Sequence, residues 1–153
     1  RRAMSAPEAP DAPVVRAAAS VAVGDQLDAR DIHLTRADLI RYAGASGDFN
    51  VIHWDERAAL AVGLPDVIAH GMLTMGQALQ VVTEWLGDPG RILEYGVAFK
   101  RPVAVDALVG ATLQFAGSVL STDEAARTAV VEISALDDGQ AVLGRARATV
   151  ALV

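Results

Sequence analysis

The sequence GMLTMGQALQVVTEWL at residues 71–86 decides the fold that we expect for this chain. Leu73, Leu79 and Val82 recur at near-helical spacing, and the remaining faces of the same segment are also largely apolar. A helix that is apolar almost all round is buried in a core, and the turn-forming stretch at residues 87–90 ends it. The uncharged run around it contains glutamines, threonines and glycines and is too short to insert into a membrane.

The hydrophobic period changes after this helix. Residues 95–99 alternate between large and small side chains, and residues 108–117, 128–136 and 142–152 are strand-like and rich in β-branched residues. A further extended segment is expected at residues 21–34. Helices followed by a run of antiparallel strands predict an α+β fold, in which a curved antiparallel sheet wraps one long buried helix.

Two shorter helices are expected before the long one. A capping-box pattern at Thr35 and Asp38 predicts a helix that runs to about Ser46. Asp55 can cap a second, short helix that ends at Gly63. The stretch between these two helices is therefore expected to be a loop.

The chain is expected to form one folded domain at residues 14–153, preceded by a flexible Ala/Pro-rich arm at residues 1–13. The arm holds half of the six prolines, and no later linker divides the chain. The Arg1-Arg2 pair does not indicate twin-arginine export, because acidic residues and prolines stand where an apolar segment should follow. We therefore expect a cytoplasmic protein.

The composition excludes several kinds of chemistry. The chain has no cysteine, which removes disulfides, thiolate metal sites and cysteine nucleophiles. Its one lysine, Lys100, does not stand in the Gly-Lys-Ser/Thr context of a phosphate-binding loop. A net charge of −6 argues against nucleic acids and anionic membranes as partners. Three histidines, His33, His53 and His70, remain for chemistry near neutral pH.

The segment SGDFNVIHWD at residues 46–55 contains the densest group of reactive side chains. Asp48 and His53 are five residues apart and can converge if the loop bends tightly, as Gly47 and Asn50 allow. A carboxylate and an imidazole close together in an apolar cleft suit general acid–base catalysis. The structural alternative is that Asp48 caps the next turn and that His53 is a core histidine.

The segment AHGML at residues 69–73 stands at the start of the long helix. The first N–H groups of a helix have no partner within it, and together with the helix dipole they can bind a developing oxyanion. Gly71 would let a ligand approach the backbone closely. The alternative is that this helix start only requires a small residue.

These two segments, SGDFNVIH at residues 46–53 and AHGMLT at residues 69–74, resemble the signature of the MaoC-like (R)-specific hydratases and dehydratases. That family has the hot-dog fold. VAFKRPV at residues 97–103 is similar to its strand motif, and the resemblance extends over residues 20–153. The family usually has proline where this chain has Val51, which puts the preorganisation of the loop in question more than the type of reaction.

Within that family, IAHGMLTMG at residues 68–76 and WLGDPG at residues 85–90 are similar to the catalytic B subunit of actinobacterial-type (3R)-hydroxyacyl-ACP dehydratases. The resemblance implies reversible dehydration of (3R)-hydroxyacyl thioesters to trans-2-enoyl thioesters, ACP-linked in fatty-acid or related acyl-chain elongation. An (R)-specific enoyl-CoA hydratase is the alternative. A non-catalytic subunit that only forms the acyl tunnel and a hot-dog thioesterase are two further possibilities.

The resemblance also implies the roles of individual residues. Asp48 and His53 form the catalytic dyad, the Gly71 N–H binds the thioester carbonyl oxygen, and Asn50 orients the loop or a water. Which member of the dyad moves which proton stays open. Four residues are expected to contact substrate: His70, Met72, Lys100 and Arg101.

We expect no metal and no cofactor beyond the ACP phosphopantetheine or CoA that carries the substrate. Asp48, His53, Asp55 and His70 are unlikely metal ligands, because the sequence has no helix-spaced histidine pair. A single hot-dog sheet leaves an edge to cover. The resemblance therefore implies a homodimer, or a heterodimer with a related hot-dog subunit, in which the two chains share one long sheet.

Five other residues receive weaker expectations. Trp54 and Trp85 are predicted to be packing residues. His33 is predicted to be structural or exposed. Arg145 and Arg147 could hold a carrier phosphate, although a solvated sheet face explains them as well.

Overall fold

The computed structural model describes residues 15–153. The predicted arm at residues 1–13 lies outside the described residues. The described chain contacts the core from its start, since the Arg16 N–H donates to the Leu86 carbonyl and the Ala18 N–H to the Val153 carbonyl. In this part of the chain, no helix is long and apolar enough to cross a membrane.

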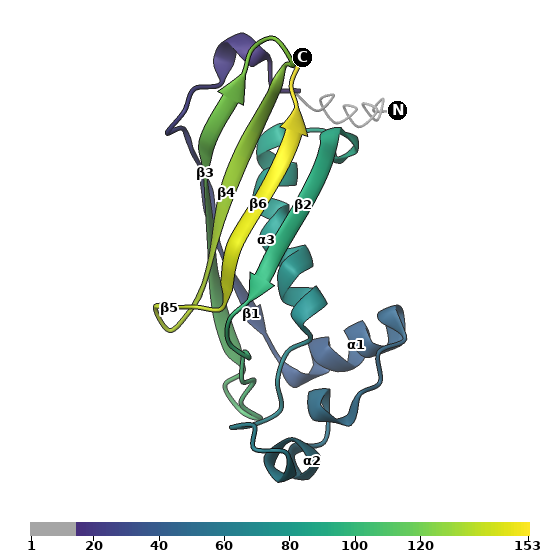
Figure 1. The fold of residues 1–153 in the computed structure, drawn as a ribbon. Coiled ribbons are helices and arrows are strands. Elements are labelled where there is room, and N and C mark those ends of the chain that lie inside the picture. Colours follow the sequence, from purple (N-terminus) through teal and green to yellow (C-terminus); the bar gives the residue numbers. More distant parts are fainter. Residues whose placement is uncertain (1–14) are drawn as a thin grey trace, which may run out of the picture.

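One antiparallel sheet forms the body of the molecule (Figure 1). Its strands follow the order β1-β3-β4-β6-β2, and the short β5 pairs with β4. The strand bounds are β1 Gln26–Leu34, β2 Ile92–Phe99, β3 Ala111–Asp123, β4 Thr128–Asp137, β5 Gln140–Ala141 and β6 Leu143–Ala151. Strands and the long helix together form the hot-dog fold, as expected.

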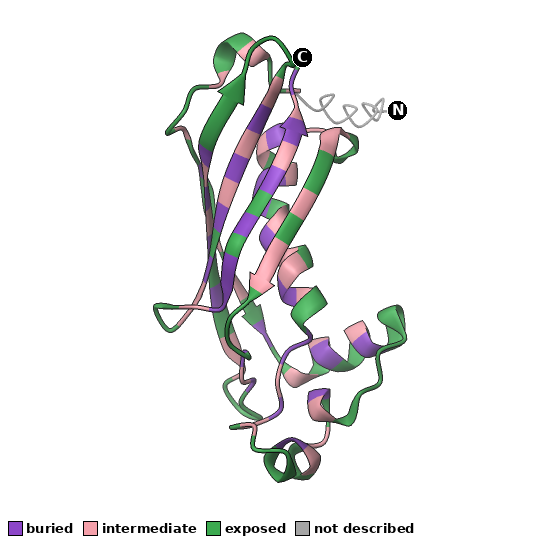
Figure 2. Ribbon diagram, viewed as in Figure 1, coloured by how far each residue is buried: buried purple, intermediate pink, exposed green. Residues whose placement is uncertain are grey.

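The long helix α3 (Gly71–Leu86) lies along one face of this sheet and has the predicted bounds (Figure 1). Its buried side chains form one stripe at helical spacing: Thr74, Ala78, Val81, Val82 and Leu86. The opposite stripe is exposed along its whole length: Met72, Gly76, Gln80 and Glu84 (Figure 2). The helix is therefore buried on one side in the single chain, not all round as its apolar composition suggested.

The smaller helices gather beside the N-terminal end of α3, beyond the end of the sheet (Figure 1). Helix α1 (Arg36–Ser46) begins with the predicted capping box and ends at Gly47, and helix α2 (Glu56–Ala61) is capped by the Asp55 carboxylate. Three short 3₁₀ turns complete the described part of the chain: η1 (Ala18–Ser20), η2 (Val51–His53) and η3 (Pro89–Arg91). Turn η2 belongs to the loop between α1 and α2 that was expected to carry the chemistry. This loop meets the start of α3, where His70, the N-cap residue, contacts Asp48.

Strand β3 differs from its prediction at both ends. Residues 107–109 form a turn and Gly110 only an isolated bridge to Asp106, because the Asp106 carboxylate accepts the N–H groups of Leu108 and Val109. At the other end, β3 continues through Gly117, where a Cβ atom would stand only 3.0 Å from Cδ2 of Leu27 on β1. A glycine that accommodates a neighbouring strand does not end the strand that contains it.

Candidate active site

The loop at residues 46–54, called the site loop below, bends sharply where α1 ends. Gly47 has φ 77° in the left-handed region, which lets the chain turn out of the helix. The Asp48 N–H then donates to the Ser46 hydroxyl oxygen, and the Asn50 N–H donates to Asp48 Oδ1. Asn50 in turn accepts the Ile52 N–H with its side-chain oxygen and so caps η2.

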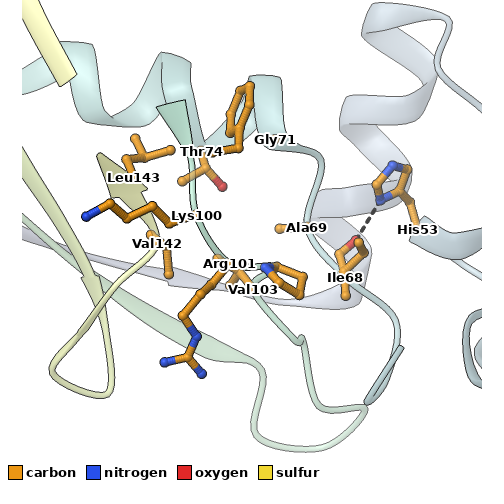
Figure 3. A pocket seen from close by; sticks show the side chains of 12 residues that line it. His53, Ile68, Ala69, Gly71, Thr74, Lys100, Arg101, Val103, Val142 and Leu143 are labelled. Carbon is orange, nitrogen blue, oxygen red and sulfur yellow. Dashed lines mark hydrogen bonds between the residues drawn. The ribbon is translucent and has the colours of Figure 1, made fainter. Parts of the chain in front are cut away.

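The side chain of His53 closes this bend. Its Nδ1 donates to the Ile68 carbonyl oxygen at 2.7 Å, which leaves Nε2 directed toward the loop (Figure 3). His53 Nε2 lies 3.9 Å from Asp48 Oδ2. The imidazole is 9% exposed and the carboxylate 53% exposed, so the pair lies at a boundary between protein and solvent.

The two carboxylate oxygens of Asp48 have different surroundings. Oδ1 accepts the Asn50 N–H and fixes the turn, whereas Oδ2 faces His53. A separation of 3.9 Å is too long for a direct hydrogen bond, but a single oxygen atom can lie within about 2.8 Å of both groups. The pair can therefore hold one water or one substrate hydroxyl between them.

His70 lies behind His53. It is 1% exposed, and its ring stacks on the His53 ring with centroids 3.7 Å apart. Its Nε2 donates to the Asp48 carbonyl oxygen at 3.1 Å, and the Tyr42 ring packs edge-on against it. Within residues 15–153, its Nδ1 is buried without a hydrogen-bond partner.

These contacts keep His70 neutral. Burial lowers the pKa of His70 below its ordinary value of 6.5. The hydrogen bond to the Asp48 carbonyl raises this pKa by less, nearby His53 lowers it further, and the Asp48 charge raises it least. A proton on Nδ1 would have no acceptor among the described residues. His70 therefore carries its proton on Nε2.

A pocket of about 310 Å³ opens beside this pair (Figure 3). His53 lines it at one end, and Gly71, the first residue of α3, lines it from the helix. Most of the remaining lining is apolar: Ile68, Ala69, Phe99, Pro102, Val103, Val142 and Leu143. The pocket thus combines an imidazole, the N-terminus of a helix and an apolar wall that suits a hydrocarbon chain.

Gly71 is packed closely against Phe99. A Cβ atom at this position would stand 3.0 Å from Cε1 of Phe99, so any side chain would displace that ring. Glycine at this position therefore leaves room for the Phe99 ring, which lines the same pocket as Gly71.

The structure brings some of the expected substrate contacts to this pocket and keeps others away. Lys100 and Arg101 line it, and the Lys100 stem runs over Gly144, where a Cβ atom would stand closer than any real contact allows. Met72 does not line it and is 59% exposed on the outer stripe of α3. His70 does not line it either, because His53 lies in front.

Asp48, His53 and His70 also satisfy the distance requirement for a metal site, since one ligand atom from each lies within 4.8 Å of the others. Their orientation does not fit one. The two imidazoles are stacked with centroids 3.7 Å apart and an interplanar angle of 22°, so their in-plane lone pairs lie in two separate, nearly parallel planes, which does not favour a shared ion.

The weaker expectations have mixed outcomes. Trp85 packs against the core, but Trp54 is 45% exposed and uses its indole N–H to close the site loop onto the Phe49 carbonyl. His33 is exposed beside Thr112. Arg147 pairs with Glu132, which agrees with a solvated sheet face.

Sequence reasoning missed three groups that contact the candidate residues. The Ile68 carbonyl accepts the His53 Nδ1–H, the Tyr42 ring packs against His70, and the Phe99 ring packs near Gly71. Main-chain acceptors carry no sequence signal, and both aromatic rings lie in segments whose patterns only indicate a helix or a strand.

Comparison with known proteins places the chain in a family. The family model described as "MaoC like domain" matches residues 18–136, most of the chain. The chain belongs to the MaoC-like domain family. Among curated proteins, the 3-hydroxyacyl-thioester dehydratase X of Mycobacterium tuberculosis is 39% identical over 79 residues, which is 52% of this chain and 27% of that protein.

Two further relatives agree with this placement. An (R)-specific enoyl-CoA hydratase of Rhodospirillum rubrum is 34% identical over 87 residues, covering 56% of this chain and 60% of the relative. A solved structure described as a MaoC-like dehydratase superposes with a TM-score of 0.89 at 41% identity, covering 100% of this chain and 48% of the other. This MaoC-like chain thus spans between about a quarter and three-fifths of the length of these relatives.

Proposed function

We propose that this MaoC-like chain catalyses the reversible dehydration of (3R)-hydroxyacyl thioesters to trans-2-enoyl thioesters. The observation that carries the proposal is the 3.9 Å separation between His53 Nε2 and Asp48 Oδ2, beside a pocket that Gly71 lines. The names of the relatives, a thioester dehydratase and an enoyl-CoA hydratase, support the same chemistry.

In this reaction the thioester carbonyl accepts a hydrogen bond from the Gly71 N–H, which makes the α-proton removable and stabilises the enolate-like transition state. One dyad atom takes the α-proton, and the other gives a proton to the leaving β-hydroxyl, which departs as water. The electron pair of the Cα–H bond becomes the new C=C bond. We assign these transfers to His53 Nε2 and Asp48 Oδ2, since Nδ1 and Oδ1 are engaged with the protein.

The test is an assay of crotonyl-CoA hydration, in which the loss of the enoyl-thioester absorbance measures the rate. Asp48→Asn and His53→Gln should each lower kcat by about 100-fold or more, because each removes one proton-transfer group. Asp31→Asn, which changes an exposed carboxylate on β1, should keep kcat within about threefold.

Three results would contradict the proposal. Wild-type protein that hydrates no enoyl thioester would exclude the activity for this chain alone. Full activity in both dyad variants would indicate a subunit that only forms the tunnel. Release of free thiol from acyl-CoA at a comparable rate would indicate a thioesterase.

For the carrier, we propose ACP, because residues 68–76 and 85–90 are similar to the catalytic subunit of (3R)-hydroxyacyl-ACP dehydratases, with CoA as the second candidate. The support for an anionic carrier is the pair Lys100 and Arg101, two exposed cations on the pocket wall that suit the phosphate of phosphopantetheine in either carrier. The likeness to an (R)-specific enoyl-CoA hydratase favours CoA. Comparison of kcat/KM for crotonyl-ACP and crotonyl-CoA decides between them, and a marked preference for CoA would exclude ACP.

We also propose that the active form pairs this chain with a second hot-dog subunit. Among residues 15–153, β2 hydrogen-bonds only to β6, so its outer edge is open to another strand. Leu93 and Phe99 on β2 are 61% and 55% exposed, and Met72 on α3 is 59% exposed. Light scattering should give the mass of a dimer, either alone or after addition of a related subunit, and a monomer under both conditions would contradict it.

A further inference from the structure

We propose that His70 is a positioning residue, which holds the main chain of Asp48 and the ring of His53 in one geometry. This role rests on the proposed function, and it differs from the substrate contact that the sequence suggested. His70 is 1% exposed and does not line the pocket, so it cannot touch a substrate that occupies it.

The first contact acts on Asp48. His70 Nε2 donates to the Asp48 carbonyl oxygen at 3.1 Å, while the Asp48 N–H donates to the Ser46 hydroxyl oxygen at 3.2 Å. The Ser46 hydroxyl donates to the Tyr42 carbonyl oxygen in the last turns of α1. Both peptide groups that flank the Asp48 Cα are therefore anchored, so its carboxylate leaves the chain from a fixed point despite being half exposed.

The second contact acts on His53. The two imidazole rings stack at a centroid distance of 3.7 Å, and the Tyr42 ring supports His70 edge-on at 4.8 Å. The bond from His53 Nδ1 to the Ile68 carbonyl sets where the ring points, and the stack sets its plane. Together they direct Nε2 toward Asp48 Oδ2.

The position of His70 in the chain adds a third constraint. His70 is the N-cap residue of α3, immediately before Gly71, and its carbonyl accepts the Thr74 N–H. One residue thus joins the start of the helix to the site loop. The distance between the acid–base pair and the N–H of Gly71 depends on this connection.

Two substitutions separate the contacts. His70→Gln keeps an N–H donor for the Asp48 carbonyl without the ring, and His70→Phe keeps a ring for the stack without the donor. Each should lower kcat for crotonyl-CoA hydration by about 10- to 100-fold, with KM within about threefold, because the pocket wall is unchanged while the reacting groups are displaced. His70→Ala, which loses both contacts, should be slower than either.

Val131→Ala is the structural control. Val131 is fully buried on β4, so this variant should lower the melting temperature and leave kcat near the wild-type value. An increase in KM with unchanged kcat in the His70 variants would indicate a substrate contact. If Val131→Ala and the His70 variants had similar melting temperatures and lost kcat equally, His70 would have only a structural role.

A measurement without substrate completes the test. Imidazole ¹⁵N spectra of the wild type should show His70 with its proton on Nε2 and His53 with its proton on Nδ1, and the His53 resonance should broaden in His70→Gln and His70→Phe. Unchanged His53 signals in both variants would overturn the positioning role. If the wild type hydrated no thioester, the proposed function would fail while these spectra still decided the role of His70.

Discussion

In the sheet, Phe115, Val131 and Val150 are buried among other apolar side chains, whereas the site loop is held by hydrogen bonds to main-chain atoms. Most residues of the site loop are exposed, and His53 is the buried one. Burial of apolar area stabilises the whole domain. Hydrogen bonds at an exposed loop contribute less to stability but determine where two polar groups stand. We therefore expect that stability and activity depend on different residues of this chain.

The largest effect on stability is expected in the sheet. Phe115 on β3 is 1% exposed, and Phe115→Ala should lower the free energy of unfolding by about 3–5 kcal/mol through lost burial and a cavity. Urea denaturation measures this loss. At a temperature where the variant is folded, kcat should stay within about threefold of the wild type. A large loss of kcat in the fully folded variant would show that activity, like stability, depends on the sheet.

Acidification should act on the site through His70, which faces His53 from η2, Asp48 from the site loop and Tyr42 from α1. Because the pKa of His70 is lowered from 6.5, the unfolded chain binds a proton that the folded chain does not. The free energy of unfolding should therefore fall as the pH decreases below 6.5, by at most about 1.4 kcal/mol per pH unit, until the lowered pKa is reached.

The control for this pH dependence is His70→Phe, which has no group to titrate. Urea denaturation between pH 5 and pH 8 should show a smaller slope for this variant than for the wild type, whatever its absolute stability. Equal slopes in the two proteins would show that the pKa of His70 is not lowered by folding.

A smaller effect is expected within the site loop. Asn50→Ala removes the acceptor for the Ile52 N–H and should lower kcat about tenfold. The free energy of unfolding should fall by about 1 kcal/mol or less. Asp55→Ala is the matched control, since it removes the cap of α2 outside the loop. That variant should lose about as much stability with kcat nearly unchanged. The comparison fails if the two variants lose activity alike.

The smallest effect is expected at Val51, where the family usually has proline. Val51 is the first residue of η2, and Asn50 before it has φ −56° and ψ 127°, which a following proline allows. Val51→Pro should therefore raise the free energy of unfolding by about 0.4–1 kcal/mol. Thermal unfolding measures the change, and Val51→Ala, which does not restrict φ, should give no gain.

The sequence predicts the parts of this molecule that depend on local patterns. The bounds of α3 follow from glycine at its start and the Gly-Asp-Pro-Gly stretch after it, and α1 follows from Thr35 and Asp38. Strand ends were less accurate, since the turn at Leu108 depends on the Asp106 side chain and the continuation of β3 at Gly117 depends on a neighbouring strand.

The sequence pointed to His53, Gly71, Lys100 and Arg101, which line the pocket, but it also pointed to His70 and Met72, which do not. The convergence of Asp48 and His53 follows from their spacing and the bend between them. The stack of His53 on His70 joins residues 17 positions apart through the tertiary fold, and the lining contributed by Val142 and Leu143 comes from the far end of the chain. Local patterns carry no information about such contacts.

The open edge of β2 also has a consequence for the solution behaviour of the chain. The segment ILEYGVAF is apolar, contains no proline and carries a single charge at Glu94. Exposed strands of this kind recruit copies of themselves into aggregates. Glu94, which is exposed, then acts as a gatekeeper against self-association. Expression of this chain alone should therefore give more aggregated protein than co-expression with a partner subunit. Replacing Glu94 with a neutral residue should increase the aggregated fraction further.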